Sequence, residues 1–307
     1  MKDYICTTPI ALIIFNRPNL TQQVLAEIRK VRPVKLLVIA DAPRTDQRDD
    51  IEKCALVRNL IDGIDWECEI IKNYSPVHLG CGKRPATGMD WVFSLVEEAI
   101  ILEDDCLPHP TFFPYCQELL KKYSDDQRIM SISGNNFQFG RRRTADSYYF
   151  SRYTQTCGWA TWKRAWRHYD FDMKLWPEVR DGKWLFDIFG SMQVANRSDQ
   201  PQFEVIGGVR VAQYWQRVFE AAYQKKIDAW DFQFAFSCFL QSGLHILPNT
   251  NLVSNIGYGP EGTHTKDKGS CLANLPVEEM EFPLKHPRFI IRDAWADTFL
   301  QANNFSC

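Results

Sequence analysis

Three consecutive carboxylates, Glu103, Asp104 and Asp105, follow a short apolar run at residues 100–102. Neighbouring carboxylates repel one another, so we expect a cation close by to offset that repulsion. Carboxylate oxygens are hard ligands that suit Mn²⁺ or Mg²⁺, and proteins often share such an ion with a phosphate-bearing ligand. The triplet therefore predicts a divalent metal site. A solvated acidic turn before the next helix is the alternative.

Asp231 is the candidate catalytic base. It stands between Trp230 and a phenylalanine, so its carboxylate would be partly desolvated and would take up a proton more readily. The alternative role is an N-cap for the apolar helix expected over residues 232–240, and the two roles are compatible. Glu204 and Asp228 are the other carboxylates in this part of the chain that could serve as the base.

A glycine-rich, basic segment at residues 79–85 precedes a helix expected to start at Thr87. Its glycines would let the backbone approach a ligand, and Lys83 and Arg84 could contact a phosphate or a base. The P-loop pattern G-x-x-x-x-G-K-[ST] is absent. The segment therefore predicts a nucleotide contact of another kind.

The first half of the chain alternates short apolar runs, typical of strands buried on both faces, with helical periodicity. Strands are predicted at 9–15, 35–40, 67–71, 100–102 and 128–133, and helices at 19–31, 49–61, 87–99 and 111–123. This alternation predicts parallel strands with right-handed crossovers, which bind ligands beyond their carboxyl ends. Arg17, Asp41 and the acidic triplet all follow such ends.

The second half is less regular. A strong helix is expected at 209–225, after loops or short elements at 181–208. No low-complexity linker separates the halves. We therefore expect one continuous domain, with a nucleotide-sugar-binding half at 1–150 and an acceptor-binding, catalytic half at 151–307.

The composition of the 307 residues is that of a soluble globular protein, with 45% apolar residues and a net charge of −2. This charge argues against a nucleic-acid binder. No apolar run approaches the roughly 20 residues of a membrane span, and the start lacks a signal-peptide core. We expect a cytoplasmic protein, with peripheral association at the inner membrane face left open. The ten cysteines form no C-x-x-C pair, which favours reduced thiols.

Six segments, in order over residues 9–266, resemble GT-A glycosyltransferases of the N-acetylglucosaminyltransferase I type. The most specific is the stretch ILEDDCLPHPTFFPY at 101–115. The other five are Pro9–Pro18, Asp41, Gly158–Trp162, Ala229–Phe232 and Asn255–His264. Two departures are a tail from Lys266 that matches no part of this family and the lack of the N-terminal anchor of its eukaryotic members.

This resemblance implies a GT-A fold: α/β, Rossmann-like, with a mostly parallel sheet flanked by helices and an elaborated C-terminal half. It implies Asp105 as the direct ligand of Mn²⁺ or Mg²⁺ and Asp231 as the base. His264 is a further candidate contact to the metal or the diphosphate, with an ordinary surface histidine as the alternative. The expected nucleotide-sugar contacts are Arg17, Asp41, Lys83, Arg84, Glu103 and Asp104. The expected acceptor contacts are Trp159, Trp162 and Trp230.

Three functions are compatible with these features. The first is an inverting, metal-dependent glycosyltransferase that moves a sugar from a UDP sugar to a hydroxyl of a glycan or glycolipid, in polysaccharide or glycolipid assembly. The second is a metal-dependent nucleotidyltransferase, which would carry a glycine-rich basic signature where residues 16–19 stand. The third is a non-catalytic carbohydrate-binding protein on a degenerate transferase fold. The intact triplet and Asp231 argue against the third.

Overall fold

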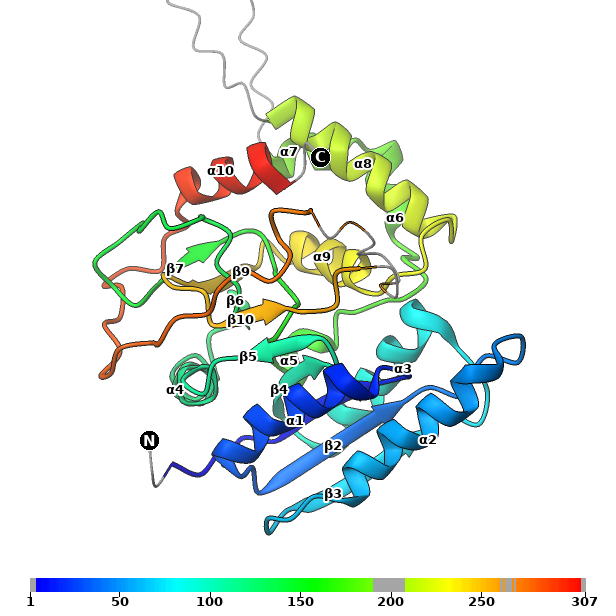
Figure 1. The fold of residues 1–307 in the computed structure, drawn as a ribbon. Coiled ribbons are helices and arrows are strands. Elements are labelled where there is room, and N and C mark those ends of the chain that lie inside the picture. The colour runs from blue at the N-terminus through cyan, green and yellow to red at the C-terminus, as the bar shows by residue number, and fades with distance from the viewer. Residues whose placement is uncertain (1–3, 190–207, 260–261, 263–266, 268, 305–307) are drawn as a thin grey trace, which may run out of the picture.

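The computed structural model describes residues 4–189, 208–259, 262, 267 and 269–304 (Figure 1). One eight-stranded sheet has the order β3-β2-β1-β4-β8-β6-β9-β7, and a small second sheet pairs β5 with β10. The strands are β1 (Ile10–Ile14), β2 (Lys35–Ala40), β3 (Glu69–Tyr74), β4 (Glu98–Glu103), β5 (Cys106–Pro108), β6 (Ile129–Ser133), β7 (Tyr148–Ser151), β8 (Trp159–Trp162), β9 (Leu244–Pro248) and β10 (Val253–Asn255).

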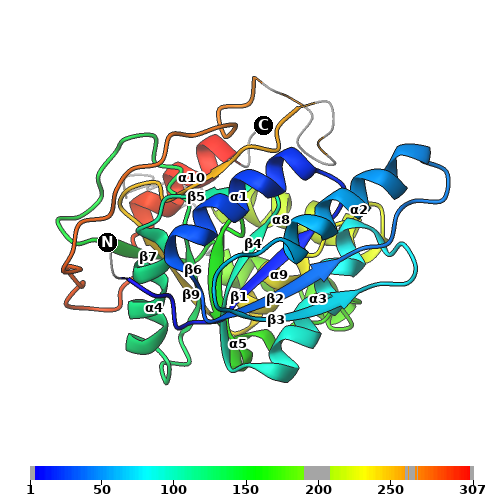
Figure 2. The same ribbon diagram turned by 60° about the horizontal axis from the view of Figure 1, so that its bottom comes forward.

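The helices cover both faces of the main sheet. They are α1 (Pro18–Val31), α2 (Arg48–Asp62), α3 (Gly80–Leu95), α4 (Phe112–Lys122), α5 (Lys163–Trp166), α6 (Trp176–Asp181), α7 (Trp184–Phe189), α8 (Gly208–Tyr223), α9 (Asp231–Leu240) and α10 (Ala294–Asn304). Apolar side chains of α1, α2 and α4 pack on one face, and those of α3, α5 and α9 pack on the other (Figures 1 and 2). The predicted α/β class is confirmed.

The sheet is mostly parallel, as predicted. β1 pairs in parallel with β2 and β4, β2 with β3, and β6 with β9. β8 is antiparallel to both β4 and β6, and β7 is antiparallel to β9. The carboxyl ends of β1, β2 and β4 therefore lie at one edge, which brings together the residues that follow them.

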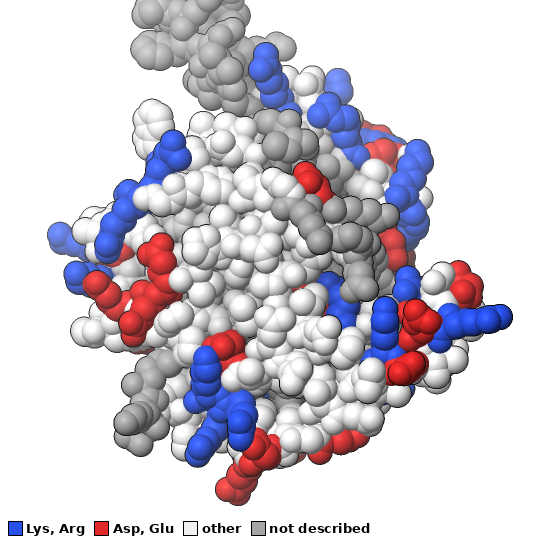
Figure 3. Space-filling view, in the orientation of Figure 1, with Lys and Arg blue, Asp and Glu red and all other residues white. Residues whose placement is uncertain are grey.

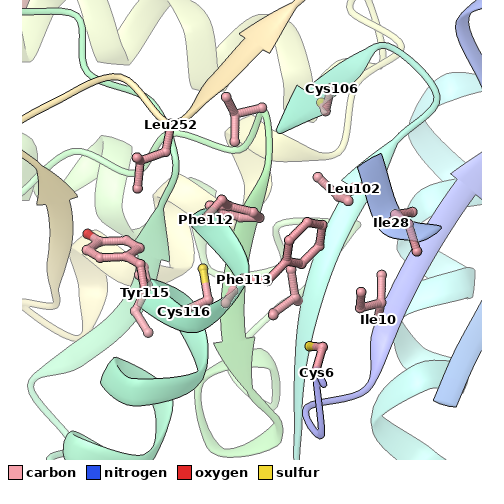
Figure 4. Close-up of a cluster of buried hydrophobic side chains, with 14 of the residues drawn as sticks. Cys6, Ile10, Ile28, Leu102, Cys106, Phe112, Phe113, Tyr115, Cys116 and Leu252 are labelled. Atoms are coloured by element: carbon pink, nitrogen blue, oxygen red, sulfur yellow. The ribbon is translucent and has the colours of Figure 1, made fainter. Parts of the chain in front are cut away.

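The core explains why these strands read as continuous apolar runs. Figure 4 shows the cluster under α4, where Phe112 and Phe113 lie beside Ile10 of β1 and Leu102 of β4. All four side chains are fully buried, and such side chains contribute roughly 1.5–3 kcal/mol each. Cys106 and Cys116 belong to the same cluster. No disulfide forms among the nine cysteines that the structure describes, which agrees with the expected reduced thiols.

One helix boundary was predicted wrongly. α3 begins at Gly80, seven residues before Thr87, and Thr87 is not its N-cap. The Thr87 hydroxyl instead donates to the carbonyl oxygen of Lys83 at 3.0 Å, inside the helix. Two glycines and Pro85 disfavour helix on propensity alone, so long-range contacts must stabilise this first turn.

Residues 190–207, and with them the candidate base Glu204, lie outside the described residues. Over the part of the chain that is described, no helix is both long and apolar enough to cross a membrane. On the face seen in Figure 3, Lys and Arg alternate with Asp and Glu near the edges and do not form one continuous basic patch.

Candidate functional site

A pocket of about 180 Å³ opens at the carboxyl ends of β1, β2 and β4. Five residues predicted to contact a nucleotide sugar line it: Arg17, Asp41, Arg84, Glu103 and Asp104. The sheet topology thus gathers side chains that are up to 87 positions apart in the sequence (104 − 17 = 87). Lys83, in contrast, is exposed on α3 and is not among the lining residues.

Arg17 bridges two carboxylates of the triplet. Its Nη1 lies 2.8 Å from Oδ2 of Asp105, and its Nη2 lies 3.2 Å from Oδ1 of Asp104. The guanidinium side chain is only 17% exposed, so solvent screens these pairs weakly. We expected a metal ion to offset the repulsion within the triplet, but part of that compensation comes from the protein itself.

The pKa values of Glu103 and Asp104 are raised in spite of the positive charge of Arg17. Burial raises the pKa of Glu103, and the charges of Asp105 and Asp104 raise it further. Burial also raises the pKa of Asp104, although Arg17 opposes that shift. The charge of Asp231 also contributes to the raised pKa of Glu103. Additional positive charge would stabilise the ionised form of this site.

The donor set fits a hard divalent cation that a bound diphosphate helps to hold. No group of three or more His, Cys, Asp or Glu side chains among the described residues makes a complete metal site. Mg²⁺ and its relatives are commonly held by only one or two carboxylates plus substrate phosphates. Asp105 and Glu103 would supply such ligands, but an oxygen of Asp105 accepts a hydrogen bond from Arg17. A cation at Asp105 would therefore compete with that guanidinium.

Asp41 lines the pocket but uses both carboxylate oxygens on backbone N–H groups. Oδ1 accepts from Ala42 and Leu79, and Oδ2 accepts from Gly80 at 2.9 Å. Its side chain is almost fully buried. Asp41 thus holds the turn that enters α3. The structure shows this positioning role, while the contact of Asp41 with a nucleotide sugar stays a prediction.

The glycines at the start of α3 approach another part of the chain. The N–H of Gly82 donates to Oδ1 of Asp228 at 3.0 Å, and a Cβ on Gly80 would lie 2.7 Å from Oδ2 of the same residue. Asp228 therefore satisfies a free amide of the first turn of α3, from 146 residues away. Asp228 and Ala229, in the loop before α9, lie against these glycines, although Gly80 also lines the pocket. The contact of this segment with a nucleotide stays a prediction.

Gly82→Ala is expected to lower the free energy of unfolding by about 1–3 kcal/mol, the usual cost of overpacking. A Cβ on Gly82 would lie 2.5 Å from Oδ1 of Asp228 and 3.0 Å from the backbone of Ala229. Urea denaturation measures the change. Gly63→Ala is the matched control, because its Cβ would meet no atom nearer than 3.5 Å. Equal stability of the two variants would contradict the contact with Asp228.

The guanidinium of Arg84 donates hydrogen bonds to the main sheet rather than to solvent. Its Nε donates to the carbonyl oxygen of Ala40 at 3.0 Å, and its Nη2 donates to Oδ1 of Asn73 at 2.7 Å. Burial lowers the pKa of this guanidinium. Arg84 thus ties the ends of β2 and β3 to α3, and its contribution to a ligand is a positive charge in the pocket wall.

The tryptophans predicted to form an acceptor platform are core residues. Trp159 is fully buried and Trp162 is 3% exposed, so neither ring offers a face to an acceptor. Trp230, 5% exposed, stacks on Trp159 with ring centroids 5.6 Å apart. The carbonyl oxygen of Trp230 accepts a hydrogen bond from Tyr169 at 3.2 Å. This cluster fixes the backbone just before Asp231, which is the first residue of α9.

The late glycine-rich loop contacts the triplet where it is described. The N–H of Ile256 donates to the carbonyl oxygen of Asp105 at 2.9 Å, and a Cβ on Gly257 would overlap the Asp105 carboxylate. Only glycine fits there. His264 lies outside the described residues, so its predicted contact with the metal or the diphosphate remains a prediction.

Three pocket residues were missed by sequence reasoning: Phe15, Arg44 and His78. The rings of Phe15 and His78 lie 5.3 Å apart, and the Arg44 guanidinium sits 5.7 Å from the centroid of Phe15. Hydrogen bonds from Arg44 lower the pKa of Asp50 to about 2, so this ion pair persists at neutral pH. The available signal was the position of Phe15 at the carboxyl end of the first predicted strand.

No protein-family model matches the chain. No curated protein matches it either.

Three solved structures align with parts of the chain. A UDP-glucose pyrophosphorylase complexed with UDP-glucose aligns at 14% identity and a TM-score of 0.28, covering 47% of this chain and 62% of that one. Galactosyltransferase LgtC, in complex with donor and acceptor sugar analogues, aligns at 12% identity and a TM-score of 0.34, covering 57% of this chain and 66% of that one. An inositol-1-phosphate CTP transferase from T. maritima aligns at 12% identity and a TM-score of 0.30, covering 53% of this chain and 73% of that one. This chain covers less than two thirds of the first two, and these scores assign no family.

Proposed function

We propose that the protein is an inverting, metal-dependent glycosyltransferase that transfers a sugar from a UDP sugar to a hydroxyl group of a glycan or glycolipid. The observation that carries this proposal is that Arg17, Glu103 and Asp104 line one pocket at the strand ends, where Arg17 also pairs with Asp105. The charge of Asp231 raises the pKa of Glu103 in the same pocket. A pocket at this edge of a parallel sheet is the usual place for a nucleotide. The resemblance of the triplet segment to GT-A enzymes supports the same proposal.

The donor would lie across the pocket with its base toward Phe15 and His78. These two rings and the Arg44 guanidinium form an aromatic, cationic wall, and such walls stack well on a nucleobase. The diphosphate would then lie toward Arg17 and the triplet. Asp104 is placed to accept a hydrogen bond from a ribose hydroxyl, and the backbone N–H of Phe15 holds its Oδ2 at 3.3 Å.

Departure of the nucleotide diphosphate develops negative charge, and Arg17 would stabilise it through N–H groups directed at the phosphates. A divalent cation at Asp105 and Glu103 would supply further Lewis-acid stabilisation when bound. The pocket is small, and its carboxylates Asp41 and Asp104 are buried. Few water molecules would compete for the leaving group, which strengthens each of these interactions.

Inversion requires one base that removes the proton of the acceptor hydroxyl as it attacks opposite the leaving group. Asp231 fits this role because it stands at the start of α9, with its backbone held by the tryptophan cluster. Asp228 is engaged with the amide of Gly82, which makes it the weaker candidate. The acceptor would approach from the side of α9.

The nucleotidyltransferase alternative would need a glycine-rich basic loop after the first strand. Here Arg17 is the only basic residue between β1 and α1, and α1 starts at Pro18. Its side chain is already paired with the triplet. This local structure favours the glycosyltransferase over the nucleotidyltransferase.

A thermal-shift panel tests the proposal. UDP, GDP, CDP, ADP and TDP are each measured with Mn²⁺ and with EDTA. A ligand at 100 times its Kd adds about 2.7 kcal/mol, which raises the Tm by several degrees in a chain of this size. We expect UDP to do so only with Mn²⁺. Absence of any shift would instead favour a non-catalytic protein on this fold.

A further inference from the structure

We propose that Arg17 is a resident counter-cation that keeps a divalent metal off Asp105 until a diphosphate gives the guanidinium another partner. Metal and nucleotide would then be taken up together rather than independently. The inference rests on the proposed function for the identity of the two ligands. It rests on the structure for the competition at Asp105.

The contacts of Arg17 are those of a bridging ion pair. Two different nitrogens reach two different carboxylates, at 2.8 Å to Asp105 and 3.2 Å to Asp104. The carboxylate side chains are 11% and 4% exposed. Both aspartates therefore hold a compensating positive charge without any ligand. A buried pair of this kind resists separation, because each partner would be left desolvated and uncompensated.

A divalent cation that arrives alone meets two obstacles. It needs the Asp105 oxygen to which Arg17 donates. Displacing the guanidinium from that oxygen would leave Asp104 as its one carboxylate partner within ion-pair distance among the described residues. A diphosphate removes both obstacles, because its oxygens accept hydrogen bonds from Arg17 and also complete the coordination of the metal. The two ligands would thus favour each other reciprocally.

The backbone of Arg17 is suited to such an exchange. Its carbonyl oxygen accepts hydrogen bonds from the N–H and the hydroxyl of Thr21, at 2.9 Å and 2.8 Å. Pro18 fixes the first turn of α1 directly after it. The residue is therefore anchored by its main chain, and the exchange needs only a rotation of its side chain from the triplet toward the phosphates.

Titration of Mn²⁺ alone into the full chain tests this proposal, by calorimetry or by the EPR signal of free Mn²⁺. We expect Arg17→Gln to bind Mn²⁺ at least tenfold more tightly than the wild type, within the usual 5–150-fold range of coupling between sites. Arg44→Gln is the matched control. It removes the same charge from the same pocket, but Arg44 pairs with Asp50 rather than with the triplet. Its Mn²⁺ affinity should stay near that of the wild type.

Several outcomes would overturn the proposal. They are an unchanged affinity in Arg17→Gln, an equal gain in Arg44→Gln, or a gain that survives the addition of Asp105→Asn. Arg17→Met, which keeps the length of the side chain without its charge, repeats the measurement if the glutamine variant unfolds. A gain with no binding of UDP would keep this inference and reject the proposed function. Binding of UDP with Mn²⁺, without a gain in the Mn²⁺ affinity of Arg17→Gln, would keep the proposed function and reject this inference.

Discussion

Replacing Asp105 with alanine is expected to abolish the Mn²⁺-dependent stabilisation of the protein by UDP. The Asp105 side chain is 11% exposed, contacts Arg17 and lies against the backbone of Gly257, so no neighbouring side chain can take its place without a rearrangement. The wild type should gain about 2.7 kcal/mol at a saturation of 100 times Kd, and the variant should gain none. The Tm with UDP and Mn²⁺, minus the Tm with UDP and EDTA, measures this loss.

Asp126→Ala is the matched control for this experiment. Asp126 pairs with Arg128 at 2.7 Å beside β6, outside the pocket. It therefore removes the same kind of ion pair without touching the triplet, and its UDP response should equal that of the wild type. Circular dichroism of both variants shows whether the fold is kept. A folded Asp105→Ala protein with the full Mn²⁺-dependent shift would show that Asp105 is not the metal ligand.

The strands that carry the site were predictable because their burial leaves a local signal. Residues 10–14 and 99–102 are buried on both faces of the sheet, so each of their positions must be apolar. The polar residues that follow are then visible as an abrupt change of composition. Parallel pairing places those changes at one edge, which is why Arg17 and the acidic triplet were expected at the same edge of the sheet.

The start of α3 could not be predicted, because distant residues stabilise it. Gly80, Gly82 and Pro85 are poor helix formers. Asp228 and the carboxylate of Asp41 supply the acceptors that the first turn lacks. Neither contact leaves a trace in the local sequence. β8 was likewise not predictable. It pairs with β4 and β6, which both precede it in the chain, and this pairing leaves no signal in the local sequence.

The contacts of the aromatic and charged residues also could not be predicted from the sequence. An indole ring packs equally well on a sugar or in a core, and Trp159 does the latter, against Trp230 and Phe234. Likewise, a guanidinium near a strand end can pair with a phosphate or with a carboxylate. The structure shows Arg17 with Asp104 and Asp105. Residue type predicted that a cation belongs in this pocket, but only coordinates show what it contacts.

Asp231→Asn is expected to reduce sugar transfer by about 10²–10⁴-fold, which is the usual contribution of a general base. Asparagine keeps the size and polarity of the side chain but cannot accept the proton of the acceptor hydroxyl. The response of the Tm to UDP and Mn²⁺ should be unchanged, because Asp231 is not among the residues that line the donor pocket. Release of UDP from a UDP sugar, in the presence of an acceptor found by glycan screening, measures the loss in kcat.

Asp228→Asn separates this role from that of its neighbour. Asp228 lines the pocket, and its Oδ1 accepts a hydrogen bond from the amide of Gly82. Asparagine keeps an acceptor oxygen for that amide, so Asp228→Asn should leave both kcat and the free energy of unfolding close to those of the wild type. The two variants therefore differ in kcat. A large loss of kcat in Asp228→Asn with normal turnover in Asp231→Asn would move the base to Asp228. It would also turn the start of α3 from a scaffold into part of the catalytic machinery.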